Sequence, residues 1–491
     1  METVLRESLQ RWGGAPSSLA PIEARMADPE VRQDAERANQ HRPRLVDEHT
    51  VEFDPSWHRL LAEAKRFGLH AAAWTSEAPA PHLTRAAGFY LWSQLEAGHG
   101  CPISMTYASV PALRKQPDLA ATWVPRLAGN ALAGMTMTER QGGSDLRAIR
   151  TTATRRSDGR YLVDGEKWFC SAPMSDAFLV LAGTAAGPTC FLVPRQPKMR
   201  LVRLKDKLGN NSNASAQVAF DGAEADLVGE EGRGLPTILE AVAATRLDCV
   251  LGSAALQRRA LTEAISHATE RYAFGAPLIR QPLMRSVLAD LVLDQQAATL
   301  LGMRLAAAVD GAEHDLLRLA LPTAKYLVCK RTPGFVAEAL ECLGGNGYVE
   351  DETVLPLLFR ESPLNSIWEG SGSIQALDVV RALHRSPAAL EAWLTEVGQA
   401  SGVDPAFDRA IEAFLQSLSD IDGEPDRVAA RARALAERMA CLLQAALLLR
   451  YAPAELASAF TASRLSGAGG LSYGVLPTGC DVAAILEHSL V

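Results

Sequence analysis

Apolar side chains recur every three to four residues between Trp57 and about residue 130, as in Phe89, Trp92 and Leu95. That spacing puts them on one face of an α-helix, so this segment is predicted to be helical. The first 50 residues are charged and show no such period. They are therefore expected to be irregular.

From about residue 131 the pattern changes to short β-prone runs. Turn residues such as Ser157-Asp158-Gly159 and Asp221-Gly222 separate these runs. Strands about ten residues apart without intervening helices predict a small β-barrel or sandwich rather than a βαβ unit. The runs are TTATRR, YLVDG, AFLVLAG, TCFLVP and AQVAF, between residues 151 and 220.

Helical periodicity returns at about Gly234 and dominates to residue 385. Its first helix is expected to begin at Pro236, because proline is favoured in the first turn. Ser386-Pro387 and the glycine and proline at 402–405 predict a linker at 384–405. Long helical segments are expected at about 236–274, 284–309, 314–342 and 406–465.

Composition and charge narrow the class of protein. Of the 491 residues, 48% are hydrophobic and 22% charged, which is typical of a globular protein and excludes a disordered, collagen-like or disulfide-scaffold chain. The net charge of -8 does not favour nucleic-acid binding by the chain as a whole. The eight cysteines form no C-x-x-C pair, which fits a reducing compartment. With no secretory segment and no apolar run of about 18 residues, a cytoplasmic protein without membrane spans is expected.

Two short motifs carry candidate chemistry. In MTMTERQGGSD at 135–145, Gly142 and Gly143 would let a ligand approach the backbone, while Thr138 and Ser144 supply hydroxyls. This suits a phosphate-bearing cofactor, although a simple β-turn at the glycines is the alternative. In IWEGSGS at 367–373, serine and glycine precede a helical run and predict an N-cap whose open N–H groups bind anions.

Glu369 in the second motif has two interpretations. Beside Trp368 and a partly apolar pocket, its carboxyl could have a raised pKa and act as a base. The alternative is a carboxylate that only complements the helix dipole. Two further motifs, LGGNGY at 343–348 and RYAFG at 271–275, look by themselves like helix caps.

Taken together, these motifs resemble the acyl-CoA dehydrogenase flavoprotein family, and more narrowly its AidB-type alkylation-response branch. The likeness runs from about residue 40 to the C-terminus and rests on MTMTERQGGSDLR, KWFCSAPMSDAFLVLA, RLKDKLGNNSNAS, FGAPLIRQPLMR and NSIWEGSG. It implies an α+β multidomain fold with an N-terminal helical domain (1–130), a middle β-barrel domain (131–233), a C-terminal four-helix bundle (234–385) and an extra helical domain (386–491).

The resemblance also implies chemistry. FAD would lie between the middle domain and the bundle. Glu369 would remove the α-proton of an acyl-CoA thioester while the β-hydride goes to flavin N5. Arg246 matches an arginine near the substrate; the alternative is a helix-surface arginine paired with Asp248 or Glu240. Ala243 stands where the family often has an aspartate that helps to hold CoA, so low activity is expected.

The residues implied as cofactor contacts fall into two groups. The first group is Met135, Thr138, Gly142, Gly143, Ser144, Phe169, Ser171, Ile367, Trp368, Gly370, Ser371 and Ser373. The second group matches a surface that covers the FAD of a neighbouring subunit, and it implies a homotetramer built as a dimer of dimers. Its members are Arg271, Phe274, Gly344 and Gly345.

The AidB-type branch further implies binding of double-stranded DNA through the extra domain. Arg427, Arg431 and Arg438 fall within about 40° on a helical wheel at about 100° per residue. They border an apolar stripe of Leu435, Met439, Leu442 and Ala446. Because residues 384–491 hold 8 arginines and no lysine against 13 acidic residues, a solvated helix face with ion pairs is the alternative. A second hypothesis is therefore a DNA-associated flavoprotein in which FAD is a structural or redox element.

Overall fold

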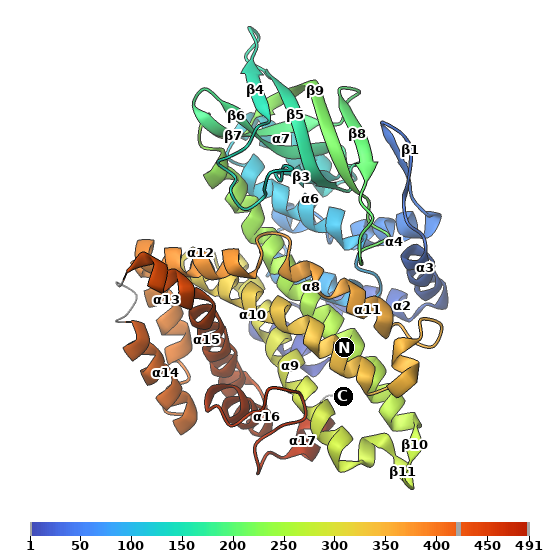
Figure 1. Ribbon diagram of the computed structural model, residues 1–491, viewed down its shortest axis with the longest axis vertical. Coiled ribbons are helices and arrows are strands. Elements are labelled where there is room, and N and C mark those ends of the chain that lie inside the picture. The colour runs from blue at the N-terminus through green and yellow to red at the C-terminus, as the bar shows by residue number, and fades with distance from the viewer. Residues whose placement is uncertain (1, 419–423, 489–491) are drawn as a thin grey trace. The chain divides into compact units, whose positions relative to one another are not determined.

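The computed structural model describes residues 2–418 and 424–488, and the chain divides into two compact units (Figure 1). One unit contains the chain up to Ser18, the segment His82–Tyr90 and everything from Cys249 onwards. The other contains Leu19–Pro81 and Leu91–Asp248. The division into four domains at residues 130, 233 and 385 stays a prediction.

The first 50 residues are helical, so the prediction of an irregular segment was wrong. They form α1 (Thr3–Arg11), α2 (Ala20–Ala27) and α3 (Pro29–Gln40). In α3 only Val31, Ala35 and Ala38 are buried, which is too few apolar residues to reveal a period in the sequence. Asp28 accepts a hydrogen bond from Glu30 N at 2.9 Å and caps the helix.

The helices predicted between residues 57 and 130 are present. They are α4 (Pro55–Arg66), α5 (Pro81–Trp92), α6 (Gly100–Leu113) and α7 (Pro117–Ala128). In α6 nearly every side chain is buried. A helix that is apolar on all sides belongs in the interior of a protein, and α6 contacts β3 in the barrel of the same unit.

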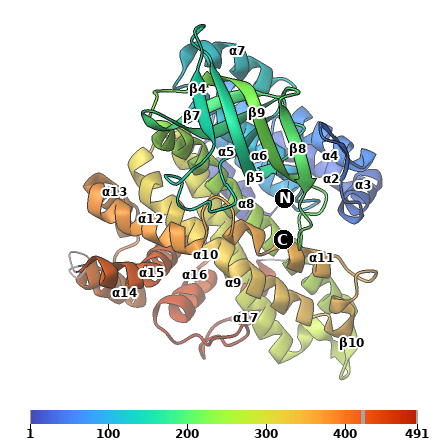
Figure 2. The same cartoon turned by 45° about the horizontal axis from the view of Figure 1, so that its top comes forward.

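The middle segment forms a β-barrel, one of the two architectures predicted. The pairings β4–β5, β5–β9, β9–β7, β7–β6 and β6–β4 close a ring, with β3 beside β6 and β8 beside β9. Figure 2 shows β5, β9 and β8 side by side. Two strands, β3 and β8, were missed. The strands are β3 (Ala133–Thr136), β4 (Thr152–Arg155), β5 (Tyr161–Ser171), β6 (Ala177–Thr184), β7 (Gly187–Pro194), β8 (Met199–Leu204) and β9 (Ser215–Leu227).

The predicted long helices are α8 (Gly234–Glu270), α9 (Pro282–Asp310) and α10 (His314–Glu341). Within its unit, α10 packs against α9, α12 (Gly372–Arg385), α13 (Pro387–Gly398) and α15 (Pro425–Tyr451). The expected linker at 384–405 was wrong, because α13 occupies it and buries Trp393 completely. Pro387 starts this helix rather than breaking the chain. The remaining helices here are α11 (Leu355–Glu361), α14 (Pro405–Leu418), α16 (Ala454–Phe460) and α17 (Val482–Glu487).

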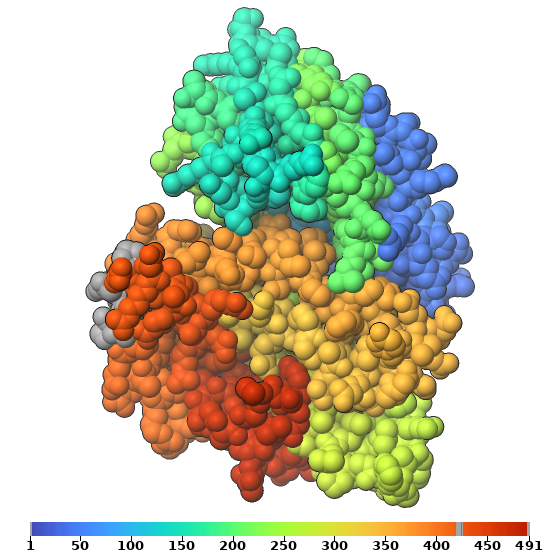
Figure 3. All heavy atoms as spheres, in the orientation of Figure 1, coloured from blue at the N-terminus to red at the C-terminus, as the bar shows by residue number. Residues whose placement is uncertain are grey.

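The cap predicted at 271–275 was also wrong, because the chain forms a β-hairpin after α8. β10 (Tyr272–Ala273) pairs with β11 (Ala276–Pro277). Phe274 and Gly275 form the turn with φ values of 52° and 81°, the left-handed pair that a two-residue hairpin favours. Phe274 is 93% exposed, and Figure 3 shows this segment, in yellow-green, on the surface.

Among the residues that the structure describes, no helix combines the length and the apolar content that a membrane crossing requires.

Candidate functional site

In the barrel-containing unit, the loop after β3 makes a tight turn. The backbone groups of Glu139 and Gly142 exchange two hydrogen bonds of 3.1 Å. The turn therefore exists, but it spans residues 139–142 and ends on the first glycine instead of being centred on the pair. A Cβ on Gly143 would lie 2.6 Å from Thr138 Oγ1, whereas one on Gly142 would meet nothing within 4 Å. Gly143 thus permits close packing on Thr138, and Gly142 leaves the backbone open to a ligand.

Hydrogen bonds join this loop to β5. Trp168 N donates to Thr138 O at 2.8 Å, and Thr136 Oγ1 donates to Phe169 O at 3.1 Å. The structure thereby holds the loop at Thr138 against the strand that carries Phe169. Phe169 is 47% exposed, whereas Met135 is buried at 6% exposure, so only the former presents its side chain to a ligand.

A buried ion pair fixes the base of the loop, and sequence reasoning missed it. Lys167 Nζ donates to Glu139 Oε1 at 2.7 Å and to Met137 O at 3.2 Å. Burial opposes ionisation of Glu139, but the hydrogen bonds from Lys167 and from Arg150 N outweigh it and lower the pKa of this carboxyl to about 2. Glu139 lies near the start of the loop and Arg150 near its end, so the Glu139–Lys167 ion pair fixes both ends of the loop.

These residues of the barrel-containing unit fit a cofactor with a flat ring and phosphates. Phe169 offers an exposed aromatic face, and Thr138, Ser144 and Ser171 offer hydroxyl groups. Ser171 lies on the same strand as Phe169, and its Oγ lies 3.1 Å from Ser215 Oγ. Apolar ring surface beside a few placed donors is the usual make-up of a cofactor site.

In the other unit, the predicted base lies in a strained loop before α12. Glu369 has a φ of 57° and Gly370 a φ of 94°. A left-handed conformation is uncommon for residues other than glycine and costs on the order of 1–3 kcal/mol. Such a conformation persists only when neighbouring groups hold it.

Lys325 and Gln375 hold this loop. Lys325 on α10 is 1% exposed, and its Nζ donates to Trp368 O and Gly370 O, both at 2.6 Å. Gln375 Nε2 donates to Glu369 O at 2.9 Å and to Gly370 O at 3.0 Å. Three successive carbonyls are therefore fixed by two buried side chains, and the backbone of Glu369 is set by them.

Sequence reasoning missed both of these residues. The available signal was a single lysine in the apolar helical run ALPTAKYLVC at 320–329, since a lysine on a buried helix face needs dedicated acceptors. The same loop is also tied through the indole of Trp368, whose Nε1 donates to Asn365 Oδ1 at 2.9 Å. Asn365 Nδ2 in turn donates to Ser253 Oγ at 3.2 Å.

The predicted N-cap of α12 is present at Ser371. Its side chain makes no capping hydrogen bond within the described structure, so the N–H groups of the first turn stay available for an anion. Ser373 is exposed in that turn and Ile367 is 62% exposed just before the loop. The first turn of α12 therefore suits a phosphate group.

The remaining predicted residues lie in three places. Arg246 on α8 is only 9% exposed, and Glu240 pairs with Lys115 at 3.1 Å instead, so Arg246 is not a helix-surface arginine. Arg271 and Phe274 belong to the β10–β11 hairpin. Gly344 and Gly345 begin a short 3-10 helix rather than a simple cap, and a Cβ on either would meet nothing within 4 Å.

The three candidate DNA-contacting arginines lie on α15 with different exposures. Arg427 is exposed, while Arg431 and Arg438 are half-buried. Arg438 Nη1 donates to Leu465 O at 3.3 Å. The adjoining apolar stripe of Leu435, Met439, Leu442 and Ala446 is buried, as predicted.

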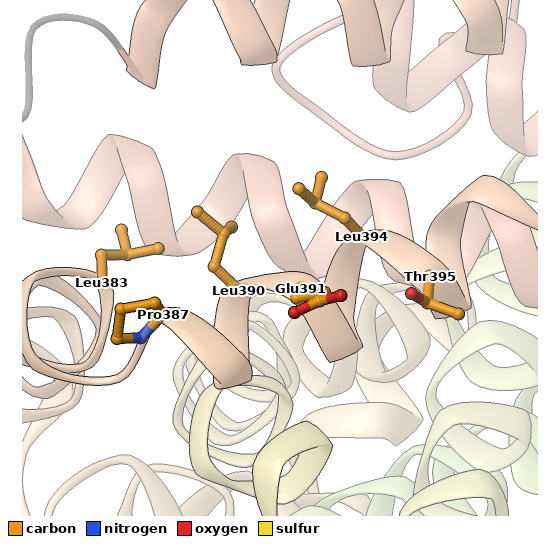
Figure 4. Close-up of a pocket in the computed structure, with 6 residues that line it drawn as sticks. All are labelled: Leu383, Pro387, Leu390, Glu391, Leu394 and Thr395. Atoms are coloured by element: carbon orange, nitrogen blue, oxygen red, sulfur yellow. The ribbon is translucent and has the colours of Figure 1, made fainter.

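A groove of about 500 Å³ runs along α12 and α13, but it holds none of the predicted site residues. Three leucines and a proline supply most of its wall, and Glu391 is its one charged side chain (Figure 4). It therefore lacks the paired acid–base or nucleophilic groups that a reaction would need.

Comparison with known proteins decides the family. Residues 1–132 match the adaptive response protein AidB N-terminal domain, 134–223 the acyl-CoA dehydrogenase middle domain and 232–384 the acyl-CoA dehydrogenase C-terminal domain. AidB of Escherichia coli strain K12 is 42% identical over 447 residues, which are 86% of this chain and 81% of AidB. The chain belongs to the acyl-CoA dehydrogenase family, in its AidB-type branch.

Solved structures agree with this assignment. Caenorhabditis elegans ACDH-11 in complex with C11-CoA has a TM-score of 0.86 and 26% identity, over 97% of this chain and 92% of that one. An acyl-CoA dehydrogenase complexed with FAD from Bacillus anthracis shares the fold, with a TM-score of 0.74 and 18% identity over 94% of this chain and 85% of that one. The protein is thus an AidB-like oxidoreductase of acyl-CoA dehydrogenase type, and FAD is its cofactor.

Proposed function

We propose that this protein removes two hydrogens across the α,β bond of an acyl-CoA thioester, with Glu369 as the base. The conformation of the Glu369 loop carries this proposal. A carboxylate that only complemented the dipole of α12 would not need a left-handed backbone held by Lys325 and Gln375. Strain of this kind is typical of residues whose side chain must stand at one fixed position.

The chemistry explains why the base must be fixed. The α-proton of a thioester is weakly acidic, so Glu369 has to meet it at hydrogen-bonding distance and away from bulk water. Trp368 gives the carboxylate an apolar neighbour. A backbone N–H beside Glu369 is the candidate donor to the thioester oxygen, where negative charge develops. Bound FAD supplies the acceptor for the hydride that leaves the β-carbon.

The same proposal assigns residues to the cofactor. Phe169 would pack on the flavin ring, and Ser171 on the same strand would hydrogen-bond it. Thr138 and Ser144 would bind near the ring and the pyrophosphate, and the first turn of α12 at 371–373 would bind phosphate oxygens. The open backbones of Gly142, Gly344 and Gly345 leave room for close approach, as their unobstructed Cβ positions indicate.

The C11-CoA complex of the nematode relative supports acyl-CoA as the substrate class. Product analysis tests this directly. FAD-loaded protein, an artificial electron acceptor and an acyl-CoA should yield a thioester lighter by two hydrogens in mass spectrometry. Because Ala243 removes a family CoA contact, turnover is expected to stay below about 10 per second. Absence of the unsaturated product at every chain length would contradict the proposal.

A homotetramer, as a dimer of dimers, is part of the proposal. Phe274 is 93%, Leu283 83% and Tyr348 82% exposed, and large apolar side chains exposed in this way indicate a protein interface. Phe274→Asp should lower the mass of the FAD-loaded assembly in light scattering, because aspartate accepts the left-handed turn but not an apolar interface. Val403→Asp, at an apolar residue that is 57% exposed elsewhere, should leave the mass unchanged. A wild-type monomer would contradict this part.

Binding of double-stranded DNA is the second candidate function, supported by the identity with AidB and by the exposure of Arg427. Changing Arg427, Arg431 and Arg438 to alanine should weaken binding to all duplexes alike, because phosphate contacts carry no sequence information. The log–log salt slope should flatten by about 0.9 for each phosphate that the variant no longer neutralises. An unchanged slope would place the DNA surface elsewhere.

A cytoplasmic location belongs to the same proposal, supported by eight free cysteines.

A further inference from the structure

One outward face of the barrel gathers three cations around a single indole ring. Lys205 Nζ lies 3.1 Å from the centroid of the Trp168 ring, and the guanidinium carbons of Arg203 and Arg140 lie 5.1 Å and 5.5 Å from it. Arg203 lies in β8 and Lys205 directly follows the strand, and both side chains reach the Trp168 ring. Arg140 comes from the turn at 139–142, a separate part of the chain.

The positive charge of this cluster is only partly balanced. Glu166 is the carboxylate that attracts Lys205. Glu166 is itself occupied by a hydrogen bond from Gln217, and Gln217 Oε1 accepts from Arg203 Nε at 3.0 Å. Three cations therefore face one carboxylate.

Lys205 is the least satisfied member. Its Nζ is buried and has no hydrogen-bond partner within the described structure, although an ammonium carries three donors. The indole face attracts the ammonium but does not replace those bonds. Burial and the neighbouring Arg203 lower the pKa of Lys205 to about 8. An anion placed between Lys205 and the two arginines would supply both the missing acceptors and the missing charge.

We propose that Trp168, Lys205, Arg203 and Arg140 form a binding site for a nucleoside phosphate. Lysine and arginine donate to phosphate oxygens, and guanidinium groups do so in pairs. The indole adds an apolar wall against which a flat base can pack. A free nucleotide and the nucleotide end of CoA share this chemistry; the second source rests on the proposed dehydrogenase function, and the first does not.

Titration calorimetry on the FAD-loaded protein tests the site with ADP as the probe. Wild-type protein should bind ADP saturably at pH 7.5, and Lys205→Met should bind about tenfold or more weakly, as expected for the loss of one charge-assisted hydrogen bond. Lys198→Met is the matched control, because it removes the same charge from an exposed position in the same unit. It should bind like the wild type.

The pH dependence of ADP binding tests whether the Lys205 ammonium is the group that binds ADP. Raising the pH to 9 should weaken binding by the wild type about tenfold, since most of the Lys205 ammonium, with its pKa of about 8, is then deprotonated. Lys205→Arg should keep its affinity at both pH values, because guanidinium stays charged. Arg140, Arg203 and Glu166 are the other charged groups that face Lys205, and Lys205→Arg retains all three. The same loss in Lys205→Arg would overturn the assignment.

Further outcomes separate the ligand sources. If ADP and CoA compete, the natural ligand of the site is the nucleotide end of CoA. If ADP binds and CoA does not compete, the ligand is a free nucleotide. Both results support the site, whether or not the protein turns over a thioester. Pyrophosphate binding as tightly as ADP would overturn the nucleoside part. The absence of saturable ADP binding would overturn the site. Loss of FAD from Lys205→Met would also overturn it, because the cluster would then belong to the FAD site. If Lys205→Met does not fold, Arg203→Gln at an exposed position should show the same weakening.

Discussion

Glu369→Gln should lower the rate of flavin reduction by an acyl-CoA thioester by about 10²-fold or more, the usual contribution of a general base. Glutamine keeps the size of the side chain but cannot accept the α-proton. The backbone of residue 369 should not move, because Lys325 and Gln375 bind the carbonyls of the loop rather than the carboxylate. Stopped-flow spectroscopy at the oxidised flavin band measures the rate.

The oxidised flavin spectrum and FAD content of this variant should equal those of the wild type, because neither depends on the carboxylate proton. Glu391→Gln, at an exposed glutamate on α13 in the same unit, is the matched control and should reduce at the wild-type rate. Full activity of Glu369→Gln would assign the base to another residue.

Lys325→Met should have the second largest effect. It removes two short hydrogen bonds, to Trp368 O and Gly370 O, and leaves the strained loop held by Gln375 and by the hydrogen bond from the Trp368 indole. The loop can then relax from the left-handed conformation at Glu369 and displace the carboxylate. A displacement of about 1 Å in a reacting group can cost on the order of 10²-fold in rate, so a decrease of that size is expected in kcat.

Thermal unfolding and FAD content separate this positioning role from general destabilisation. Lys325→Met should retain cooperative unfolding, because methionine fills much of the buried volume and needs no acceptors. Lys330→Met, at an exposed lysine on the same helix, should change neither rate nor stability. An unchanged kcat in Lys325→Met would show that the two carbonyl contacts do not set the position of Glu369.

Sequence patterns predicted the elements that bury a regular apolar face. The strands β6 and β7 could be placed as short continuous apolar runs, β5 and β9 as β-prone runs between turn residues, and the helices α8 to α10 as long helical segments. Patterns failed where burial is sparse, as in α3, and at Ser386-Pro387, which was interpreted as a linker but begins α13. The hairpin at Phe274 could not be foreseen, because its turn requires a left-handed phenylalanine.

The candidate site divides in the same way. Motif order and spacing singled out Glu369, the 135–144 loop and Phe169, because these residues lie in short contiguous segments. Lys325 lies 43 residues before Trp368, to whose carbonyl it donates. No local pattern links two such positions, and the same holds for the Lys167–Glu139 pair beneath the loop, which is 28 residues apart. Contacts of this kind become visible only when the fold brings distant elements together.

The most direct test of the central claim is anaerobic titration of the FAD-loaded protein with acyl-CoA thioesters of increasing chain length, followed in the visible spectrum. The account predicts that at least one thioester bleaches the oxidised flavin band of the wild type and leaves that of Glu369→Gln unchanged on the same timescale. A folded, FAD-loaded wild-type protein that dithionite reduces but no thioester bleaches would contradict it.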